Sequence, residues 1–275
     1  MEYHCLVAGL PDIHWENLQN VPNLEQLLEQ FRSVLSKKDR KLLDLLLMKY
    51  DNLNFLSFLR NPEAELSPLA LLSTQDWKEL VDLMEGEEFP KDKRLQPYLL
   101  KFYRQRFDNQ GKIDSSISDE DLLTTLYFEF GTSCCNTFIA QWFEFCMNVN
   151  NVLAATICRK HGFDVKQAVI GDNEVAEALR TNNSRDFGLS GILDEAQMLL
   201  SLAEESNFYQ REKMIDALKW NWLEEHAFFH PFEREKIFAY WLQCELLNRW
   251  NLLNVEKGTL IFKSLLDEMK KDVKF

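Results

Sequence analysis

The segment that decides the fold is residues 138–157, which read FIAQWFEFCMNVNNVLAATI. Its apolar residues recur at alternating intervals of four and three, the spacing that places side chains on one face of an α-helix. This stripe consists of Phe138, Trp142, Phe145, Val149, Val152 and Thr156, and it is widened by Ile139, Phe143, Cys146, Leu153 and Ile157. The opposite side is polar or small, at Gln141, Glu144, Asn148, Asn151 and Ala155. A helix this apolar must be covered on most of its sides, so we expect it to be the spine of the protein.

The wider segment from Ser118 to Asp164 carries very little charge. Between Leu122 and Cys158 the only charged residues are Glu129 and Glu144. These carboxylates and several asparagines interrupt the apolar runs, so no stretch reaches the roughly 20 mainly apolar residues that a membrane span needs. We therefore expect a buried helix in an all-α protein rather than a membrane span.

Helical patterns and helix caps recur along the rest of the chain. Ser36 with Asp39, and Ser118 with Asp121, have the spacing of helix N-caps. Further helices are predicted at 23–31, 36–58, 74–86, 97–107, 174–180, 192–205, 208–229, 231–253 and 259–271. Pro231 is expected to open its helix, because proline is favoured at the first helical position. Residues 3–10 fit either a strand or the first turn of a helix.

Turn-forming and polar residues cluster at 108–117, which predicts a boundary between two lobes. We expect one protein over residues 1–275, with bundle-like helical lobes around the long central helix. Residues 1–107 would form the N-terminal part and residues 118–275 the second part.

Composition limits the classes of function. Of the 275 residues, 46% are hydrophobic, and there are only 9 glycines and 7 prolines, which favours helices joined by short loops. The net charge of −13 argues against nucleic acid as a partner, because phosphate binding needs a concentrated basic surface. It also disfavours an anionic membrane surface, whereas a basic protein partner would fit.

Cysteine usage and the N-terminal residues predict a cytoplasmic location. Most of the six cysteines lie in hydrophobic helical segments, and no pair has the Cys-x-x-Cys spacing of metal sites. The first residues lack the basic and apolar regions of a secretory signal. We therefore expect reduced thiols in a cytoplasmic protein.

The sequence offers one weak candidate for a metal site. His226 and His230 are four residues apart, which could place two imidazoles on one helical face, but Pro231 follows directly and Ala227 stands where a zincin has glutamate. We therefore interpret both as structural or surface histidines, and the adjacent Cys134 and Cys135 as buried small residues. Phosphate-binding loops and nucleophile elbows are absent from the sequence. We expect no catalytic, cofactor-binding or metal-binding residue, no small-molecule substrate and no enzyme activity.

The chain resembles the C-subunit family of V/A-type ATPases, whose eukaryotic member is called the d-subunit. The first stretch that carries this is similar to the family's Asp-x-x-Asn-hydrophobic segment with a later basic residue, Gly and Asp. Its positions here are Asn148, Asn151, Val152, Arg159, Gly162 and Asp164. Asn148 stands where the family prefers aspartate.

Two more stretches carry the resemblance. Residues 237–242, followed by Glu245, are similar to the family's Tyr-hydrophobic-hydrophobic-x-x-Glu helix, with Tyr240 as its tyrosine. The opening Met-x-Tyr-x-x-Leu-Val-Ala-x-Leu-Pro-Asp, which contains Tyr3, resembles a short bacterial branch encoded beside V-type ATPase genes. The family's second late glutamate is Leu247 here, its Asn-Leu-Arg ending falls on residues 250–252, and residues 23–117 match only in being helical.

The resemblance implies a cup of helical lobes in the central stalk of a rotary ATPase, between the central shaft and the membrane rotor ring. Such a protein takes part in ion transport, such as proton transport, without catalytic residues or cofactors. It would lie at the inner face of the membrane through protein contacts only. The alternatives are a generic cytoplasmic helical adaptor and, less favoured, a helical metal-dependent enzyme that uses His226 and His230.

Overall fold

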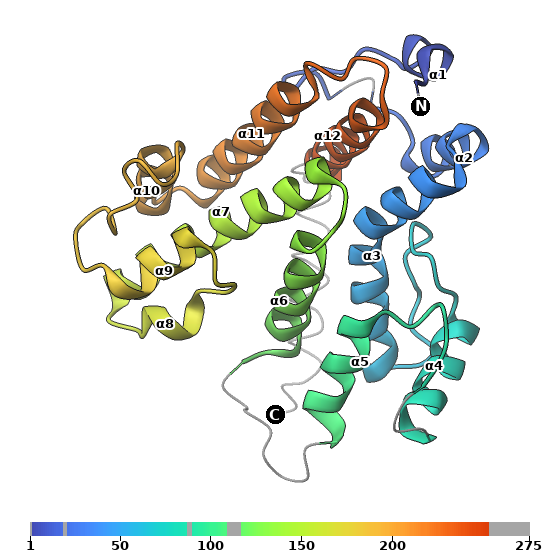
Figure 1. Ribbon diagram of the computed structural model, residues 1–275, viewed down its shortest axis with the longest axis horizontal. Coiled ribbons are helices and arrows are strands. Elements are labelled where there is room, and N and C mark those ends of the chain that lie inside the picture. The colour runs from blue at the N-terminus through green and yellow to red at the C-terminus, as the bar shows by residue number, and fades with distance from the viewer. Residues whose placement is uncertain (1, 19–20, 87–89, 109–116, 253–275) are drawn as a thin grey trace, which may run out of the picture. The chain divides into compact units, whose positions relative to one another are not determined.

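The computed structural model describes residues 2–18, 21–86, 90–108 and 117–252 (Figure 1). Every regular element in these ranges is a helix, and they contain no strand, which confirms the all-α prediction. None of the described helices is long and apolar enough to cross a membrane. The helix predicted at 259–271 lies outside the described residues.

The chain divides into two compact units. The terminal unit combines the described residues of ranges 1–34 and 216–275, and the central unit comprises the described residues of range 35–215. The lobe boundary expected at 108–117 lies mostly outside the described residues and stays a prediction.

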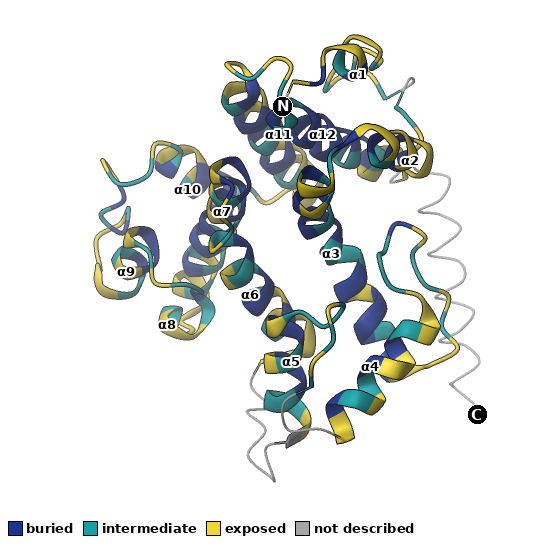
Figure 2. Ribbon diagram, turned by 45° about the vertical axis from the view of Figure 1, so that its right-hand side comes forward, coloured by how far each residue is buried: buried dark blue, intermediate teal, exposed yellow. Residues whose placement is uncertain are grey.

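The central unit is built around one long helix, as the sequence predicts. Its helices are α3 (Lys37–Arg60), α4 (Thr74–Gly86), α5 (Pro97–Tyr103), α6 (Asp119–Thr132), α7 (Thr137–His161), α8 (Val165–Ala168), α9 (Glu174–Thr181) and α10 (Ala196–Glu204), with a π-helical turn η1 (Arg104–Asp108) after α5. Helix α7 packs against α6, α8, α9 and α10, while α6 also packs against α3 and α5. In Figure 2, dark blue buried residues run along much of α7 and α3.

The predicted caps and the apolar stripe of α7 are confirmed. The hydroxyl oxygens of Ser36 and Ser118 accept from the backbone N–H groups of Asp39 and Asp121 at 3.1 Å. The stripe residues of α7 are buried except Thr156, which is half-buried. On the opposite side, Asn148, Asn151 and Ala155 are buried as well. Helices α8 and α9 contact α7 and provide this further cover.

A buried amide on α7 satisfies backbone groups of the segment between α8 and α9. Asn151 is 1% exposed. Its Nδ2 donates to the carbonyl oxygen of Ile170 at 2.8 Å, and its Oδ1 accepts from the Ile170 N–H at 2.9 Å. The Asn151 side chain therefore satisfies both backbone hydrogen-bonding groups of Ile170.

Polar residues of α3 fasten other parts of the central unit in the same way. The Asp51 carboxylate accepts from the backbone N–H groups of Leu71 and Leu72 at 3.0–3.1 Å. Asn52 accepts a 2.6 Å hydrogen bond from the hydroxyl of Tyr98 on α5. Burial, together with the nearby Asp51 charge, raises the pKa of Tyr98 above its usual value, so this phenol stays protonated as the donor.

The terminal unit consists of α1 (His4–Ala8), α2 (Leu24–Val34), the larger part of α11 (Phe208–Ala227) and α12 (Arg234–Leu252). Residues 3–10, for which the sequence allowed either a strand or the first turn of a helix, therefore contain a short helix. The ring of Phe31 on α2 lies edge-on to that of Trp241 on α12, with centroids 6.4 Å apart. The hydroxyl of Tyr240 donates to the Pro11 carbonyl oxygen at 2.8 Å.

A buried carboxylate joins α11 to α12. Asp216 on α11 is 0% exposed. Its Oδ2 accepts from Nη1 of Arg249 at 2.6 Å and from Nε1 of Trp250 at 3.1 Å, and its Oδ1 lies 3.4 Å from Nζ of Lys219. A buried charge is tolerated when it is paired and hydrogen-bonded in this way.

Several predicted helix boundaries are wrong. Helix α11 ends at Ala227 rather than at 229, and α12 begins at Arg234 rather than at Pro231. The reason is a series of turns in which the N–H groups of Phe228, His230 and Glu233 each donate to the carbonyl three residues earlier. Helix α10 likewise begins at Ala196 rather than at 192, after turns at 186–193, and the helix predicted at 97–107 becomes π-helical at Arg104.

The amide of Asn151 generates a stability prediction. Asn151→Ala leaves both backbone groups of Ile170 without this partner, so we expect the free energy of unfolding to fall by about 1–3 kcal/mol. Asn150→Ala is the matched control, because Asn150 is the preceding residue of α7 and is exposed. Urea denaturation of both variants measures the difference, and equal effects would contradict the role assigned to Asn151.

The Asp216 pair predicts an asymmetry between its two ends. Arg249→Met leaves a buried carboxylate that has lost its main countercharge, so we expect a loss of about 3–5 kcal/mol in the free energy of unfolding. Asp216→Asn leaves a guanidinium that is 43% exposed and can be hydrated, so its loss is expected to be smaller. Chemical denaturation at pH 7 tests the order, and a larger loss in Asp216→Asn would contradict it.

Candidate functional site

The positions singled out by the sequence resemblance fall into two groups. The central unit holds Asn148, Asn151, Arg159, Gly162 and Asp164, and the terminal unit holds Tyr3, Tyr240 and Glu245. Each group is described within its own unit.

The two asparagines hold the segment that follows α7. Besides the Asn151 pair with Ile170, the Oδ1 of Asn148 accepts from Nδ2 of Asn173 at 2.9 Å. The same Nδ2 lies 2.9 Å from a carboxylate oxygen of Glu144. The Oδ1 of Asn173 accepts from the Ala176 N–H at 3.0 Å and so caps α9. These amides therefore fasten α9 to α7, which is a structural role.

Arg159 supports a loop with an unusual backbone conformation. Its Nη1 donates to the Ser184 carbonyl at 2.6 Å and its Nη2 to the Asn182 carbonyl at 3.2 Å. The guanidinium carbon lies 3.3 Å from the centroid of the Phe187 ring. Phe187 has φ 54°, the one positive φ of a non-glycine residue among those described. Desolvation lowers the pKa of Arg159 below its usual value, and the residue's contacts give it a structural role.

Gly162 and Asp164 end one helix and start the next. Gly162 has φ 73°, in the left-handed region that favours glycine, and it closes α7 while the Phe163 N–H donates to the Cys158 carbonyl at 2.8 Å. The Asp164 carboxylate accepts from the Lys166 N–H at 3.0 Å and caps α8. Both motif positions are explained by local chain geometry.

Two of the three motif positions of the terminal unit, Tyr3 and Tyr240, are buried. The backbone N–H of Tyr3 donates to the Phe232 carbonyl at 2.6 Å, and Tyr240 bonds to Pro11 as described. Desolvation raises the pKa of Tyr240 above its usual value. Glu245 is half-buried on α12. Tyr3 and Tyr240 therefore contribute to the packing of the terminal unit.

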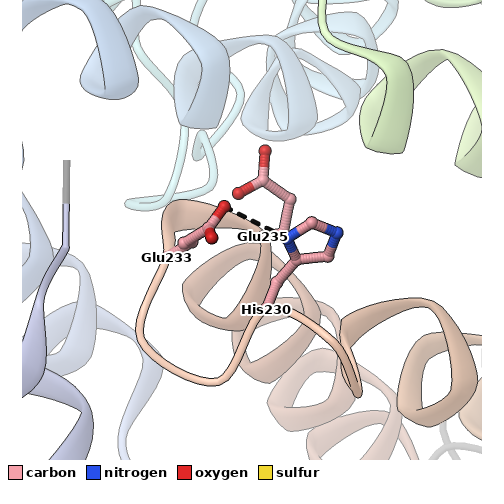
Figure 3. A group of neighbouring side chains, drawn as sticks. All are labelled: His230, Glu233 and Glu235. Atoms are coloured by element: carbon pink, nitrogen blue, oxygen red, sulfur yellow. Dashed lines mark hydrogen bonds and ion pairs between the residues drawn. The ribbon is translucent and has the colours of Figure 1, made fainter.

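The two histidines do not form the pair that the sequence suggested as an alternative. His226 lies in α11, where its ring stacks on Trp222 with centroids 3.7 Å apart and its Nδ1 lies 2.9 Å from the Trp222 carbonyl oxygen. His230 lies beyond the end of α11, in the turn. The structure instead brings His230 together with Glu233 and Glu235 (Figure 3). The Nδ1 of His230 is 3.1 Å from Oε2 of Glu233.

The most exposed aromatic side chains among the described residues lie in that same turn. We call residues 228–233 the aromatic turn. Phe228 is 73% exposed, Phe229 82% and Phe232 39%. The rings of Phe228 and Phe229 lie perpendicular to each other with centroids 5.1 Å apart. Full burial of a phenylalanine side chain stabilises a fold by about 1.5–3 kcal/mol. This fold leaves Phe228 and Phe229 without that stabilisation. Adjacent exposed aromatic residues are typical of a surface that binds another protein.

Residues at the start of the chain contact the aromatic turn. The Tyr3 N–H reaches the Phe232 carbonyl, and the His4 ring lies 4.4 Å from the Phe232 ring, centroid to centroid. The turn is further closed by the hydrogen bonds of Phe228, His230 and Glu233 to earlier carbonyls. The turn therefore has a defined backbone, which reduces the ordering cost of presenting its rings to a partner.

Charges beside the aromatic turn are mainly negative. Glu224 and Glu225 are exposed in the last turn of α11, and Glu233 lies in the turn itself with its side chain 46% exposed. Arg234 follows, but its Nε is paired with Glu235 at 3.0 Å. A partner with basic residues around an apolar recess would be complementary to this surface.

Sequence reasoning missed the aromatic turn because it extended the two flanking helices through it. The signal was present as Phe228-Phe229-His230-Pro231-Phe232, a run of aromatic residues interrupted by proline between two long helical patterns. Aromatic residues that belong to neither helix do not extend the buried face of either one. That pattern could have identified an exposed aromatic loop.

Comparison with known proteins places the chain in a family. A family model described as "Protein of unknown function (DUF2764)" matches residues 1–273, which include every residue that the structure describes. No curated protein and no solved structure matches the chain. Because the match extends over both compact units, the chain belongs to the DUF2764 family of proteins of unknown function.

Proposed function

We propose that this protein is a non-catalytic peripheral component of a V/A-type rotary ATPase that couples the central shaft to the membrane rotor ring. The proposal rests on the sequence resemblance to the C-subunit family and on the aromatic turn, which is the observation that favours a binding role. It assigns the protein no catalytic residue, cofactor or small-molecule substrate. Under this proposal the protein lies at the cytoplasmic face of the membrane through contacts with other ATPase components.

The aromatic turn supplies the physical basis for docking. Burial of Phe228 and Phe229 in a partner would contribute about 3–6 kcal/mol, which corresponds to about two to four orders of magnitude in the dissociation constant. Fully desolvated aromatic anchors carry most of the binding energy in many interfaces. Two rings on a fixed turn can fill this role without reorganisation of the helices that carry them.

The charge of the protein specifies the chemistry of the partner surface. With a net charge of −13 and with Glu224, Glu225 and Glu233 around the rings, the best partner surface has an apolar recess with a basic rim. Exposed charges of this kind steer association and are screened by salt over about 8–10 Å. Binding should therefore weaken as the ionic strength rises.

The test is affinity purification of the tagged full-length protein from its native membranes, followed by mass spectrometry. We expect shaft and rotor-ring proteins of a rotary ATPase at low salt and less of them at high salt. The double variant Phe228→Ser/Phe229→Ser should recover at least about tenfold less of the docked partner, because each lost anchor is worth more than about 1.4 kcal/mol. Deletion of the protein should uncouple ATP hydrolysis from ion pumping.

Phe163→Ser is the matched control, because Phe163 is 68% exposed in the central unit. It should leave recovery through the aromatic turn unchanged. Recovery of an unrelated complex without ATPase components at low salt would contradict the rotary proposal and favour the generic helical adaptor. An equal loss in the control and in the double variant would contradict the role of the aromatic turn.

A further inference from the structure

We propose that His230, Glu233 and Glu235 form a binding site for a divalent transition-metal ion, with Zn²⁺ as the best fit. The inference does not rest on the proposed function, and two of its residues, His230 and Glu233, belong to the aromatic turn. It differs from the pair His226 and His230 that the sequence suggests, because His226 is engaged with Trp222 and is not part of the cluster.

The first support is geometric. One ligand-type atom from each of the three residues lies within 4.8 Å of the others. Ligands bound to Zn²⁺ at about 2.0–2.2 Å in tetrahedral geometry lie about 3.3–3.6 Å from one another. The His230 Nδ1 and the Glu233 Oε2 are 3.1 Å apart, close to that spacing.

The second support is the chemistry of the donor set. An imidazole nitrogen with two carboxylate oxygens suits Zn²⁺ and other first-row transition metals. Ca²⁺ and Mg²⁺ prefer oxygen ligands alone, so the histidine argues against them. Three protein ligands leave a coordination position for water or for a group from another molecule.

The third support is the charge and placement of Glu235. Glu235 is 8% exposed and lies in the first turn of α12, and its Oε1 is 3.0 Å from Nε of Arg234. With Glu233 beside it, the cluster has two carboxylates and one guanidinium, so one negative charge remains to attract a cation. Figure 3 shows His230 and Glu233 on the turn that precedes the helix carrying Glu235. A bound ion would therefore cross-link the aromatic turn to the helix that follows it.

The structure also fits a simpler interpretation, in which His230 is only an ion-pair or hydrogen-bond partner of Glu233. The two interpretations differ in what Zn²⁺ does. The metal site requires that Zn²⁺ binds and raises the thermal stability of the protein, because a ligand that binds only the folded state stabilises it. In the simpler interpretation, Zn²⁺ has no effect through these residues.

The experiment is calorimetric titration of the chelator-treated full-length protein with Zn²⁺, with Mg²⁺ as a second titrant. We expect one Zn²⁺ per chain and no comparable binding of Mg²⁺. His230→Ala and Glu233→Gln should each weaken Zn²⁺ binding by at least about tenfold, since loss of even an outer-shell partner costs that much at known sites. Thermal unfolding should show a Zn²⁺-dependent rise in Tm that these variants lack.

Three control variants make the result specific. His226→Ala removes the other histidine of the sequence pair, and Glu225→Gln removes an exposed carboxylate on the same stretch of chain. Cys134→Ser/Cys135→Ser removes two adjacent thiols that could bind Zn²⁺ elsewhere. The interpretation of both as buried residues is wrong, because Cys135 is exposed and Cys134 is half-buried. All three variants should bind Zn²⁺ as the unmodified protein does. No Zn²⁺ binding, or binding that is lost in the cysteine variant and kept in His230→Ala, would overturn the proposal.

Discussion

The terminal unit depends on the ion pair and hydrogen bonds of the buried Asp216 carboxylate. It is fully buried on α11, and its countercharge and hydrogen-bond donors, Arg249 and Trp250, come from α12. A buried charge fixes the arrangement of its partners, because any movement that separates them leaves the carboxylate unsatisfied. The two helices joined by the aromatic turn are thereby held together at a distance from that turn. The turn can then expose Phe228 and Phe229 at a fixed position.

The central unit uses neutral amides for the same purpose. Asn151 and Asn148 occupy a face of α7 that is covered by the following segment, and each pairs with a group of that segment. Arg159 adds a third attachment, with its guanidinium on the Phe187 ring. These central-unit residues, which carry the sequence resemblance, thus hold the segment that follows α7 against α7.

The sequence predicted the features that depend on local chemistry. The apolar spacing of α7 and the serine caps at Ser36 and Ser118 follow from neighbours along the chain. The burial of Asn148 and Asn151 could not be predicted in this way, because it depends on which segment covers them. A polar residue on a helix is expected to face solvent unless its distant partner is known.

The candidate site was less predictable than the fold for a similar reason. Pro231 is compatible with the first position of a helix and also with a turn, and only the hydrogen bonds of residues 228–233 distinguish the two. Once α11 ends at Ala227, His230 leaves the face of His226 and comes close to Glu233 and Glu235. Phe228 and Phe229 change at the same time from helix residues to exposed rings.

The central claim is that the aromatic turn docks onto a component of a rotary ATPase, and a cross-link from the turn itself tests it most directly. A photo-reactive phenylalanine analogue in place of Phe229 can be activated in intact cells, and the product identified by mass spectrometry. The account predicts a cross-link to a shaft or rotor-ring protein of the ATPase. A cross-link only to proteins outside that complex would contradict it.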